Sequence, residues 1–161
     1  MISPPKAIAA YVTQLKSYVR DAIGRRVEDD FSKAHISLFK YRDEHAEDLL
    51  YEADSKISSF TPFTVFIKDL NVAQEADGWS IYLDIVHKAP LFEIAENIAG
   101  HEVDFTPRIT IARSLDLNEF LKVWGTLKEL SYSQYFKCDH ITVMKKEPRK
   151  WVHHADILLA A

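Results

Sequence analysis

Apolar and polar residues alternate along several stretches of the chain, a pattern typical of strands with one buried face. The clearest stretch is Phe105–Arg113, and Pro107 suits its opening position because proline has no N–H to donate to a neighbouring strand. Its two isoleucines predict a core face. The residues that alternate with them are predicted to share the opposite face: Arg108, Thr110 and Ala112.

An earlier stretch, Ala34–Phe39, repeats this pattern. Ile36 and Leu38 are predicted to face the core, while His35 and Ser37 face the other way. Each stretch therefore presents a basic residue and a hydroxyl residue two positions apart on its polar face, which is about 7 Å along a strand.

Apolar residues three or four positions apart predict four helices. The predicted spans are Pro4–Ile23, Asp43–Ile57, Pro90–Ala99 and Asp116–Leu127. Proline suits a first helical turn, aspartate caps a helix, and Gly24 and Gly100 suit the residue that follows one. Gly125, inside the last helix, predicts close packing or a bend at that point.

The other predicted strands are Phe63–Leu70, Trp79–Val86, Phe136–Lys145 and Trp151–Leu159. Ala76–Gly78 and Glu147–Arg149 have the composition of the turns that join them in pairs, and Arg25–Lys33 is a charged connector. After the first helix, the order strand, helix, strand, strand occurs twice, with a helix between the two copies. This repeat indicates an internal duplication of an α+β unit.

Composition places the chain among ordinary globular proteins. At 161 residues and 18.5 kDa, with 47% apolar residues, we expect one domain covering residues 1–161. The net charge of −4 argues against binding long nucleic acid by bulk electrostatics, although a local basic pocket is compatible with a short or terminal nucleotide. Cys138 has no cysteine to pair with, and no signal peptide or membrane span is found, so the cytoplasm is expected. The oligomeric state stays open.

Only four glycines occur, and no glycine-rich phosphate loop or dinucleotide fingerprint can be assembled from them. Nucleoside-triphosphate hydrolases and Rossmann enzymes are therefore excluded. Any bound phosphate has to be held by side chains, and no cofactor is predicted.

The two alternating stretches resemble the motifs of the two-histidine (2H) phosphoesterases, which include 2',5'-RNA ligase-like proteins and cyclic phosphodiesterases. His35 and Ser37 match the first motif, His-x-Ser/Thr-Leu. The second motif is matched at Phe105, Pro107, Thr110, Ala112 and Arg113. Its histidine position holds Arg108, so one of the two side chains that define the family is replaced.

The resemblance implies two pseudo-symmetric lobes of antiparallel sheet with flanking helices, and motif strands that face a cleft between the lobes. This agrees with the α+β class and the internal duplication. The family usually begins with a strand before its first helix, whereas only Met1–Ser3 precede the prolines here. Either that strand is very short, or the chain begins downstream of it.

In the family, one histidine activates water or a hydroxyl and the other protonates the leaving oxygen. The resemblance therefore implies that His35 transfers the proton, that Ser37 and Thr110 bind phosphate oxygens, and that Arg113 adds positive potential. Arg108 completes the predicted catalytic set, but a guanidinium, with a pKa above about 12, grips a phosphate and does not release a proton at neutral pH. Catalysis is expected to be impaired or altered. The competing interpretation is a set of solvent-facing strand residues in an unused site.

Two other histidines are weaker candidates to compensate for the missing one. His140 begins a similar pattern, but it aligns with an ordinary strand position of the first repeat. His101 lies in the loop before the second motif. His153 and His154 are adjacent on a predicted strand and face opposite ways, so they form no shared metal site, and no metal is predicted.

These observations leave three hypotheses for function. The first is metal-independent phosphodiester chemistry on a small nucleotide, cyclic phosphate or RNA end. The second is a phosphate-ligand or nucleotide binding protein without catalysis, which uses Arg108, Ser37 and Thr110 as a clamp. The third is a structural or partner-binding protein that retains only the scaffold. The natural substrate is not specified by the sequence.

Overall fold

The structure, a computed structural model, describes residues 1–40 and 46–160, without the side chains of residues 46–49. The helices of this part of the chain are α1 (Lys6–Ile23), α2 (Ala46–Ile57), α3 (Ala89–Ala99) and α4 (Leu117–Leu127). The strands are β1 (Phe63–Glu75), β2 (Gly78–Ile85), β3 (Arg108–Leu115), β4 (Ser133–Cys138), β5 (His140–Lys146) and β6 (Trp151–Leu158). The predicted cap Asp43 lies outside the described residues, as does the side chain of Leu49.

The strands form a four-stranded antiparallel sheet in the order β3-β2-β1-β4 and a two-stranded antiparallel sheet of β5 and β6. Short segments connect the two sheets. Ile36 pairs with Ile109 of β3 on one side and with Ile2 on the other, and the backbone of Met1 exchanges hydrogen bonds of 2.8 Å with Thr142 of β5. Met1 and Ile2 thus link the two sheets through backbone hydrogen bonds.

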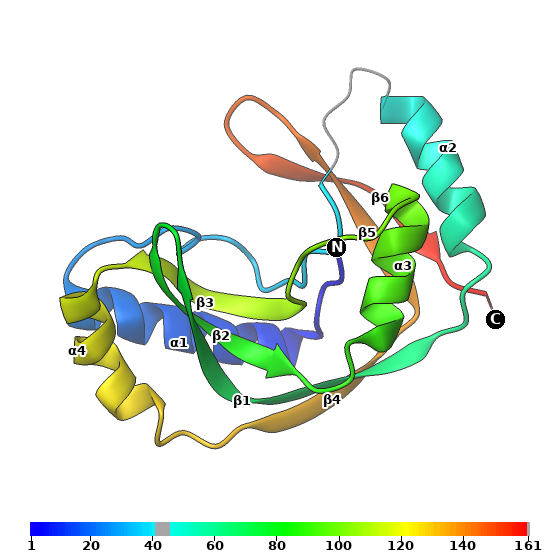
Figure 1. Cartoon of the computed structure of the whole chain (residues 1–161). Coiled ribbons are helices and arrows are strands. Elements are labelled where there is room, and N and C mark those ends of the chain that lie inside the picture. The colour runs from blue at the N-terminus through cyan, green and yellow to red at the C-terminus, as the bar shows by residue number, and fades with distance from the viewer. Residues whose placement is uncertain (41–45, 161) are drawn as a thin grey trace.

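The helices divide between the two sheets, which gives the two lobes of Figure 1. Helices α1 and α4 pack on the four-stranded sheet, while α2 and α3 pack against each other and α2 contacts β6. The predicted α+β fold with two antiparallel lobes is confirmed. The lobes do not coincide with the two sequence repeats, however, because the larger sheet combines β1 and β2 of the first repeat with β3 and β4 of the second.

Helix α1 follows directly from its sequence pattern. Ile8, Val12, Leu15 and Val19 form its buried stripe. Gly24 adopts a left-handed conformation (φ 80°) and its N–H bonds to Arg20 O, which ends the helix where the sequence predicted. At α4, Asp116 accepts from the Glu119 N–H and the Glu119 carboxylate accepts from the Asp116 N–H, a complete capping box.

Two of the predicted strands differ from the observed ones in more than their end residues. The first motif is extended, but Ile36 is its only residue in a β-bridge among the described residues, so it forms no continuous ladder. The predicted strand Phe136–Lys145 is two strands, because the chain changes sheets at Asp139: β4 pairs with β1 as far as Cys138, and β5 then pairs with β6. Alternation continues across the bend and therefore gives no sign of it.

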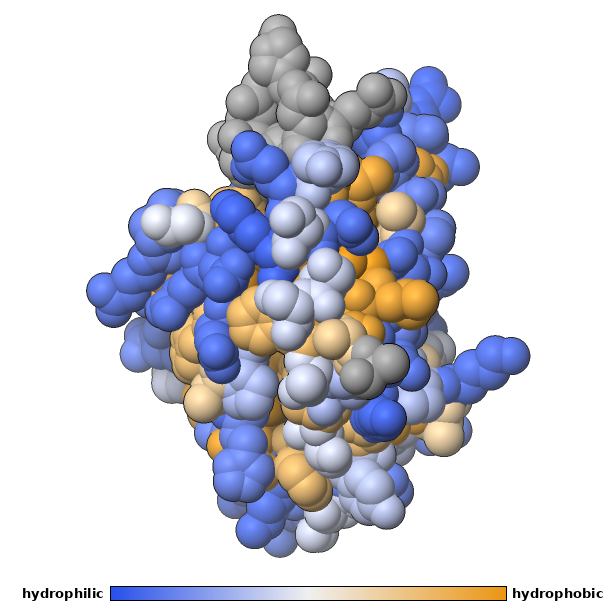
Figure 2. Space-filling model, turned by 90° about the vertical axis from the view of Figure 1, so that its right-hand side faces the viewer, coloured by the Kyte–Doolittle hydropathy of each residue, from blue (hydrophilic) through white to orange (hydrophobic). Residues whose placement is uncertain are grey.

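A single core cluster extends through both lobes, and the isoleucines of both motifs are fully buried in it. None of the helices in the described part of the chain has the length and apolar character required to cross a bilayer. Figure 2, which views the molecule from the right-hand side of Figure 1, shows hydrophilic surface over most of that face with smaller apolar areas between.

Two glycines provide a matched test of this fold. Gly78 has φ +130°, and a Cβ there would lie 2.6 Å from the backbone oxygen of Leu115. Gly125 has no heavy atom within 4 Å of such a Cβ, so the close packing predicted for it is wrong. We expect Gly78→Ala to lower the free energy of unfolding by more than about 1 kcal/mol. Gly125→Ala should raise it by up to about 1 kcal/mol in urea denaturation. Effects of the same sign would contradict these backbone conformations.

Candidate active site

The two motif segments lie side by side in the structure. Ile36 and Ile109 are antiparallel partners, and both are completely buried. This register sets His35 opposite Thr110 and Ser37 opposite Arg108. Since opposite residues of an antiparallel pair point to the same side, the four predicted residues share one face of the sheet.

The register of β3 changes beyond these residues. Tyr82 of β2 pairs with Thr110, but Ile81 pairs with Ala112, so Ile111 forms a β-bulge. The bulge returns Ala112 to the core face, where it is fully buried, and the prediction that Ala112 shares the polar face is wrong. Tyr82 instead lies beside Thr110 on that face.

The segment before His35 is held in place by a buried lysine of α1. Lys16 of α1 is only 3% exposed and donates to the carbonyl oxygens of Asp29 (2.7 Å) and Ser32 (2.9 Å) and to the Ser32 hydroxyl (2.9 Å). Burial lowers the pKa of Lys16, partly offset by the nearby carboxylates of Asp29 and Asp30. The apolar stripe of α1 gives no indication of this role, because Lys16 lies next to Leu15 within it.

The hydrogen bond of the His35 ring indicates which of its nitrogens carries a proton. Nδ1 lies 2.7 Å from the carbonyl oxygen of Lys33. A carbonyl only accepts, so Nδ1 carries a proton, and Nε2 of the neutral ring is the acceptor. Nε2 has no hydrogen bond to any described residue, and the same holds for the hydroxyls of Ser37 and Thr110. These three groups are available to a ligand.

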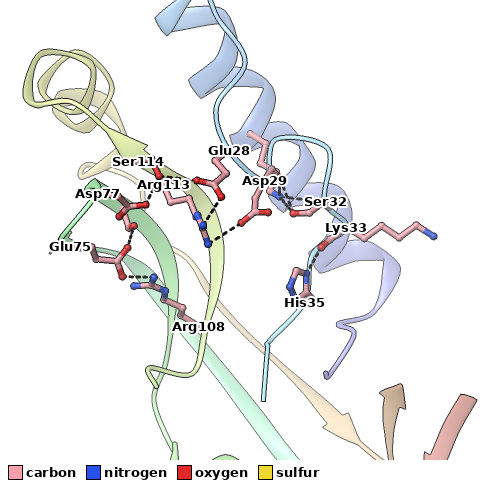
Figure 3. Close-up of polar contacts among 12 residues, drawn as sticks. Glu28, Asp29, Ser32, Lys33, His35, Glu75, Asp77, Arg108, Arg113 and Ser114 are labelled. Atoms are coloured by element: carbon pink, nitrogen blue, oxygen red, sulfur yellow. Dashed lines mark hydrogen bonds and ion pairs between the residues drawn. The ribbon is translucent and has the colours of Figure 1, made fainter. Parts of the chain in front are cut away.

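Arg108 is engaged by a carboxylate that the sequence did not reveal. Its Nη2 donates to Glu75 Oε1 at 2.6 Å, and its guanidinium lies 4.9 Å from the centroid of the Tyr82 ring. Figure 3 shows the Arg108 side chain directed toward Glu75, at the end of the β1–β2 hairpin, while His35 lies on the separate segment after Lys33. The guanidinium has five N–H donors, so this bond leaves others for an anion.

Glu75 is ionised in this arrangement. Partial burial raises the pKa of its carboxyl group, but hydrogen bonds from Ser80 and Arg108 and the charge of Arg108 outweigh it, so the pKa lies below the ordinary value of 4.5. Glu75 therefore competes with any phosphate for Arg108. Glu75 directly precedes the predicted turn Ala76–Gly78, and the sequence carried no signal of this contact because the partners are 33 residues apart.

Arg113 makes a separate set of contacts at the far end of β3. It binds Glu28, lies 3.6 Å from Asp29, and thereby ties β3 to the connector before the first motif (Figure 3). Burial lowers the pKa of Arg113, but its hydrogen bond to Glu28 and the surrounding carboxylates outweigh burial, so the net shift of the pKa is upward. The role of Arg113 in ligand binding stays a prediction.

The other candidate histidines bond to residues next to them. His140 Nδ1 lies 2.7 Å from Asp139 Oδ1, and His101 Nδ1 lies 2.8 Å from the carbonyl oxygen of Glu102. Neither makes a hydrogen bond to a motif residue in the described part of the chain. There, no group of three histidine, cysteine or acidic side chains is arranged to hold a metal ion.

Comparison with known proteins agrees with the paired motifs. A family model described as the 2'-5' RNA ligase superfamily matches residues 4–150, which span both motifs and all four helices. The chain belongs to the 2'-5' RNA ligase superfamily. This membership supports a phosphoesterase-like function for the chain.

Among solved structures, this superfamily member is similar to the crystal structure of TT0787 of Thermus thermophilus, at 12% sequence identity and a TM-score of 0.69. The match covers 98% of this chain and 94% of that one, and at this identity it shows the fold alone. No curated protein matches the sequence.

The contact between Glu75 and Arg108 predicts that Glu75→Gln increases affinity for inorganic phosphate. Removing the competing charge should strengthen binding by up to about fivefold, since a partly exposed ion pair contributes about 1 kcal/mol or less. Isothermal titration calorimetry measures the affinity. Asp77→Asn is the matched control, because the Asp77 carboxylate bonds Ser114 instead. Equal affinities of the two variants would show that Glu75 does not limit access to Arg108.

The same pair predicts a pH dependence of stability. Because the pKa of Glu75 is depressed in the folded state, its ionised carboxylate stabilises the fold above the ordinary pKa of 4.5, and this stabilisation is lost as the pH falls. In the variant Glu75→Gln, the free energy of unfolding should therefore decrease less steeply as the pH falls below that value. Urea denaturation at a series of pH values tests this, and an unchanged slope would contradict it.

Proposed function

We propose that this member of the superfamily binds a nucleotide, cyclic phosphate or RNA-end phosphate between the two motifs, and that Arg108 alters its catalysis. The observation that supports this most is the pairing of Ile36 with Ile109, because it sets an imidazole, a guanidinium and two hydroxyls on one face. All four can contact one tetrahedral anion. The cytoplasm remains the expected location.

The proposed chemistry is attack of water on a 2',3'-cyclic phosphate. Nε2 of His35 accepts the proton of the attacking water, while Ser37 and Thr110 donate to the non-bridging oxygens. Arg108 balances the charge on the phosphate. One P–O bond forms to the water oxygen and one ring P–O bond breaks, which yields a phosphomonoester. The leaving ring oxygen takes its proton from solvent water, because a guanidinium does not supply one at neutral pH.

The missing proton donor makes a phosphate-binding protein without turnover the second candidate. Two observations favour it. Arg108 replaces the second histidine of the motif, and Glu75 holds its guanidinium at 2.6 Å. Loss of one general acid typically lowers a rate by about 10² to 10⁴. Turnover of a cyclic nucleotide favours the enzyme, whereas saturable binding without turnover favours the binding protein.

Affinity for a phosphate ligand should depend on Arg108. We expect Arg108→Ala to weaken binding of a 2',3'-cyclic nucleotide by about 1.5–3 kcal/mol, the range for hydrogen bonds to charged groups. Added salt should weaken wild-type binding more than variant binding. Calorimetric titration at two salt concentrations measures both effects. An unchanged dissociation constant in the variant would remove Arg108 from the site.

Arg108→His should create or raise metal-independent turnover. It restores an imidazole at the position of the second motif histidine, and a working general acid is worth about 10² to 10⁴ in rate. The folding cost should stay within about 1 kcal/mol, because the ion pair with Glu75 that is lost is partly exposed. The assay is hydrolysis of a 2',3'-cyclic nucleotide in the presence of a chelator.

His35→Ala in the Arg108→His background is the control, and it should abolish the gain. Should the wild type be fully active and Arg108→His slow it, the arginine would belong to a working mechanism. The description of this site as altered would then be wrong.

A further inference from the structure

One face of the four-stranded sheet becomes more exposed from the candidate active site toward the outer strand. A row of directly paired residues crosses the sheet from Arg108 through Asp84 and Lys68 to Ser133. Paired residues point to the same side, so this row lies on the face that also carries Thr110. Arg108 and Asp84 are half-buried and the other two are exposed, whereas Ile109, Leu83 and Ile67, which alternate with them on β3, β2 and β1, are buried in the core.

An aromatic pair lies on this face, two residues along the strands from that row. Phe66 of β1 and Tyr135 of β4 are cross-strand partners, with ring centroids 6.0 Å apart and ring planes inclined by 38°. Phe66 is 41% exposed and Tyr135 is 69% exposed. The His87 ring packs edge-on against Phe66 at 5.6 Å. Such an exposed pair presents ring faces to a planar ligand.

Two lysines flank the aromatic pair on the same face. Lys68 follows Phe66 by two residues on β1, and Lys137 follows Tyr135 by two residues on β4. Both are exposed, and neither forms an ion pair with any described residue.

The acidic side chains near these lysines are engaged elsewhere. The Asp84 carboxylate binds Lys88 at 2.8 Å, Asp139 accepts from His140 Nδ1 at 2.7 Å, and Asp69 accepts from the Tyr132 N–H at 2.8 Å. Lys68 and Lys137 are therefore available to an anionic ligand. Aromatic rings that alternate with lysines along strands suit a ligand that is both planar and anionic.

We propose that this face binds single-stranded RNA that continues from the phosphate at the active site. Bases stack on Phe66 and Tyr135, and backbone phosphates lie on Lys68 and Lys137. The proposal rests on the proposed function and makes an RNA end several nucleotides long, and not a mononucleotide, the ligand of the site. Stacking of bases on sheet aromatics beside a positive surface is an established mode of single-strand recognition.

The spacing along the sheet fits this ligand. Phe66 lies two strands from Arg108, about 10 Å across the sheet, and one two-residue step of about 7 Å along it. A short stretch of two or three nucleotides spans such a distance, which is the number of bases that one sheet face typically stacks. The chain thus needs no extended basic surface to retain its ligand.

The test uses fluorescence anisotropy of the full chain with a 5'-labelled RNA of about ten nucleotides that ends in a 2',3'-cyclic phosphate. We expect the double variant F66A/Y135A to bind this RNA at least about tenfold more weakly. Its affinity for a cyclic mononucleotide should not change. Tyr51→Ala removes an exposed aromatic from α2 and is the matched control, with unchanged RNA affinity. K68A/K137A should reduce the dependence of RNA affinity on salt.

Three outcomes would overturn the RNA-binding surface or distinguish its failure from failure of the proposed function. RNA affinity equal in F66A/Y135A and Tyr51→Ala would overturn the RNA surface, and Arg108-dependent binding of the mononucleotide would then leave the proposed function standing. RNA binding that needs Phe66 and Tyr135, without any mononucleotide binding, would support the surface and remove the proposed function. A wild-type dimer in light scattering that F66A/Y135A dissociates would assign the face to self-association and overturn the proposal.

Discussion

The pairing of Ile36 with both Ile2 and Ile109 is the constraint on which the rest of the molecule depends. The Ile36 side chain is completely buried, and its N–H and C=O bond to Ile2 at 2.8 and 2.9 Å. Ile36 therefore joins β3 of the larger sheet to the Met1–Ile2 segment, which bonds to β5 of the smaller sheet. The same pairing fixes the register of the two motifs. One buried side chain thus couples the architecture of the lobes to the positions of His35 and Thr110.

The candidate site pairs a permanently charged arginine with a carboxylate. Arg108 replaces a residue that titrates near neutral pH with one that stays charged, and Glu75 balances that charge in the absence of ligand. Tyr82 limits where the guanidinium can lie, at 4.9 Å from its ring. The site therefore holds a positioned cation on a shared face. Such an arrangement suits recognition of an anion, and among the described residues of the two motifs only His35 supplies an imidazole.

Much of this was accessible from the sequence because it depends on local periodicity. The stripe of α1, the cap of α4 and the two-residue turn before Gly78 follow from short-range rules, and the motifs identified the face that carries His35 and Arg108. Contacts between distant segments were not accessible. The partnership of Glu75 with Arg108 depends on how the β1–β2 hairpin lies beside β3. The burial of Ala112 depends on a bulge, and a bulge leaves no mark on alternation.

The exchange of strands between the sequence repeats has a consequence for how the chain folds. β1 pairs with β4 in a register that joins Phe63 to Cys138, so the larger sheet cannot close until most of the chain has been synthesised. Contacts so distant in sequence carry a large loop-closure cost before they contribute stability, and they are associated with slow, cooperative folding. Neither half of the chain contains the complete four-stranded sheet. The two halves therefore form a single folding unit, in which each half supplies hydrogen-bonding partners of the other.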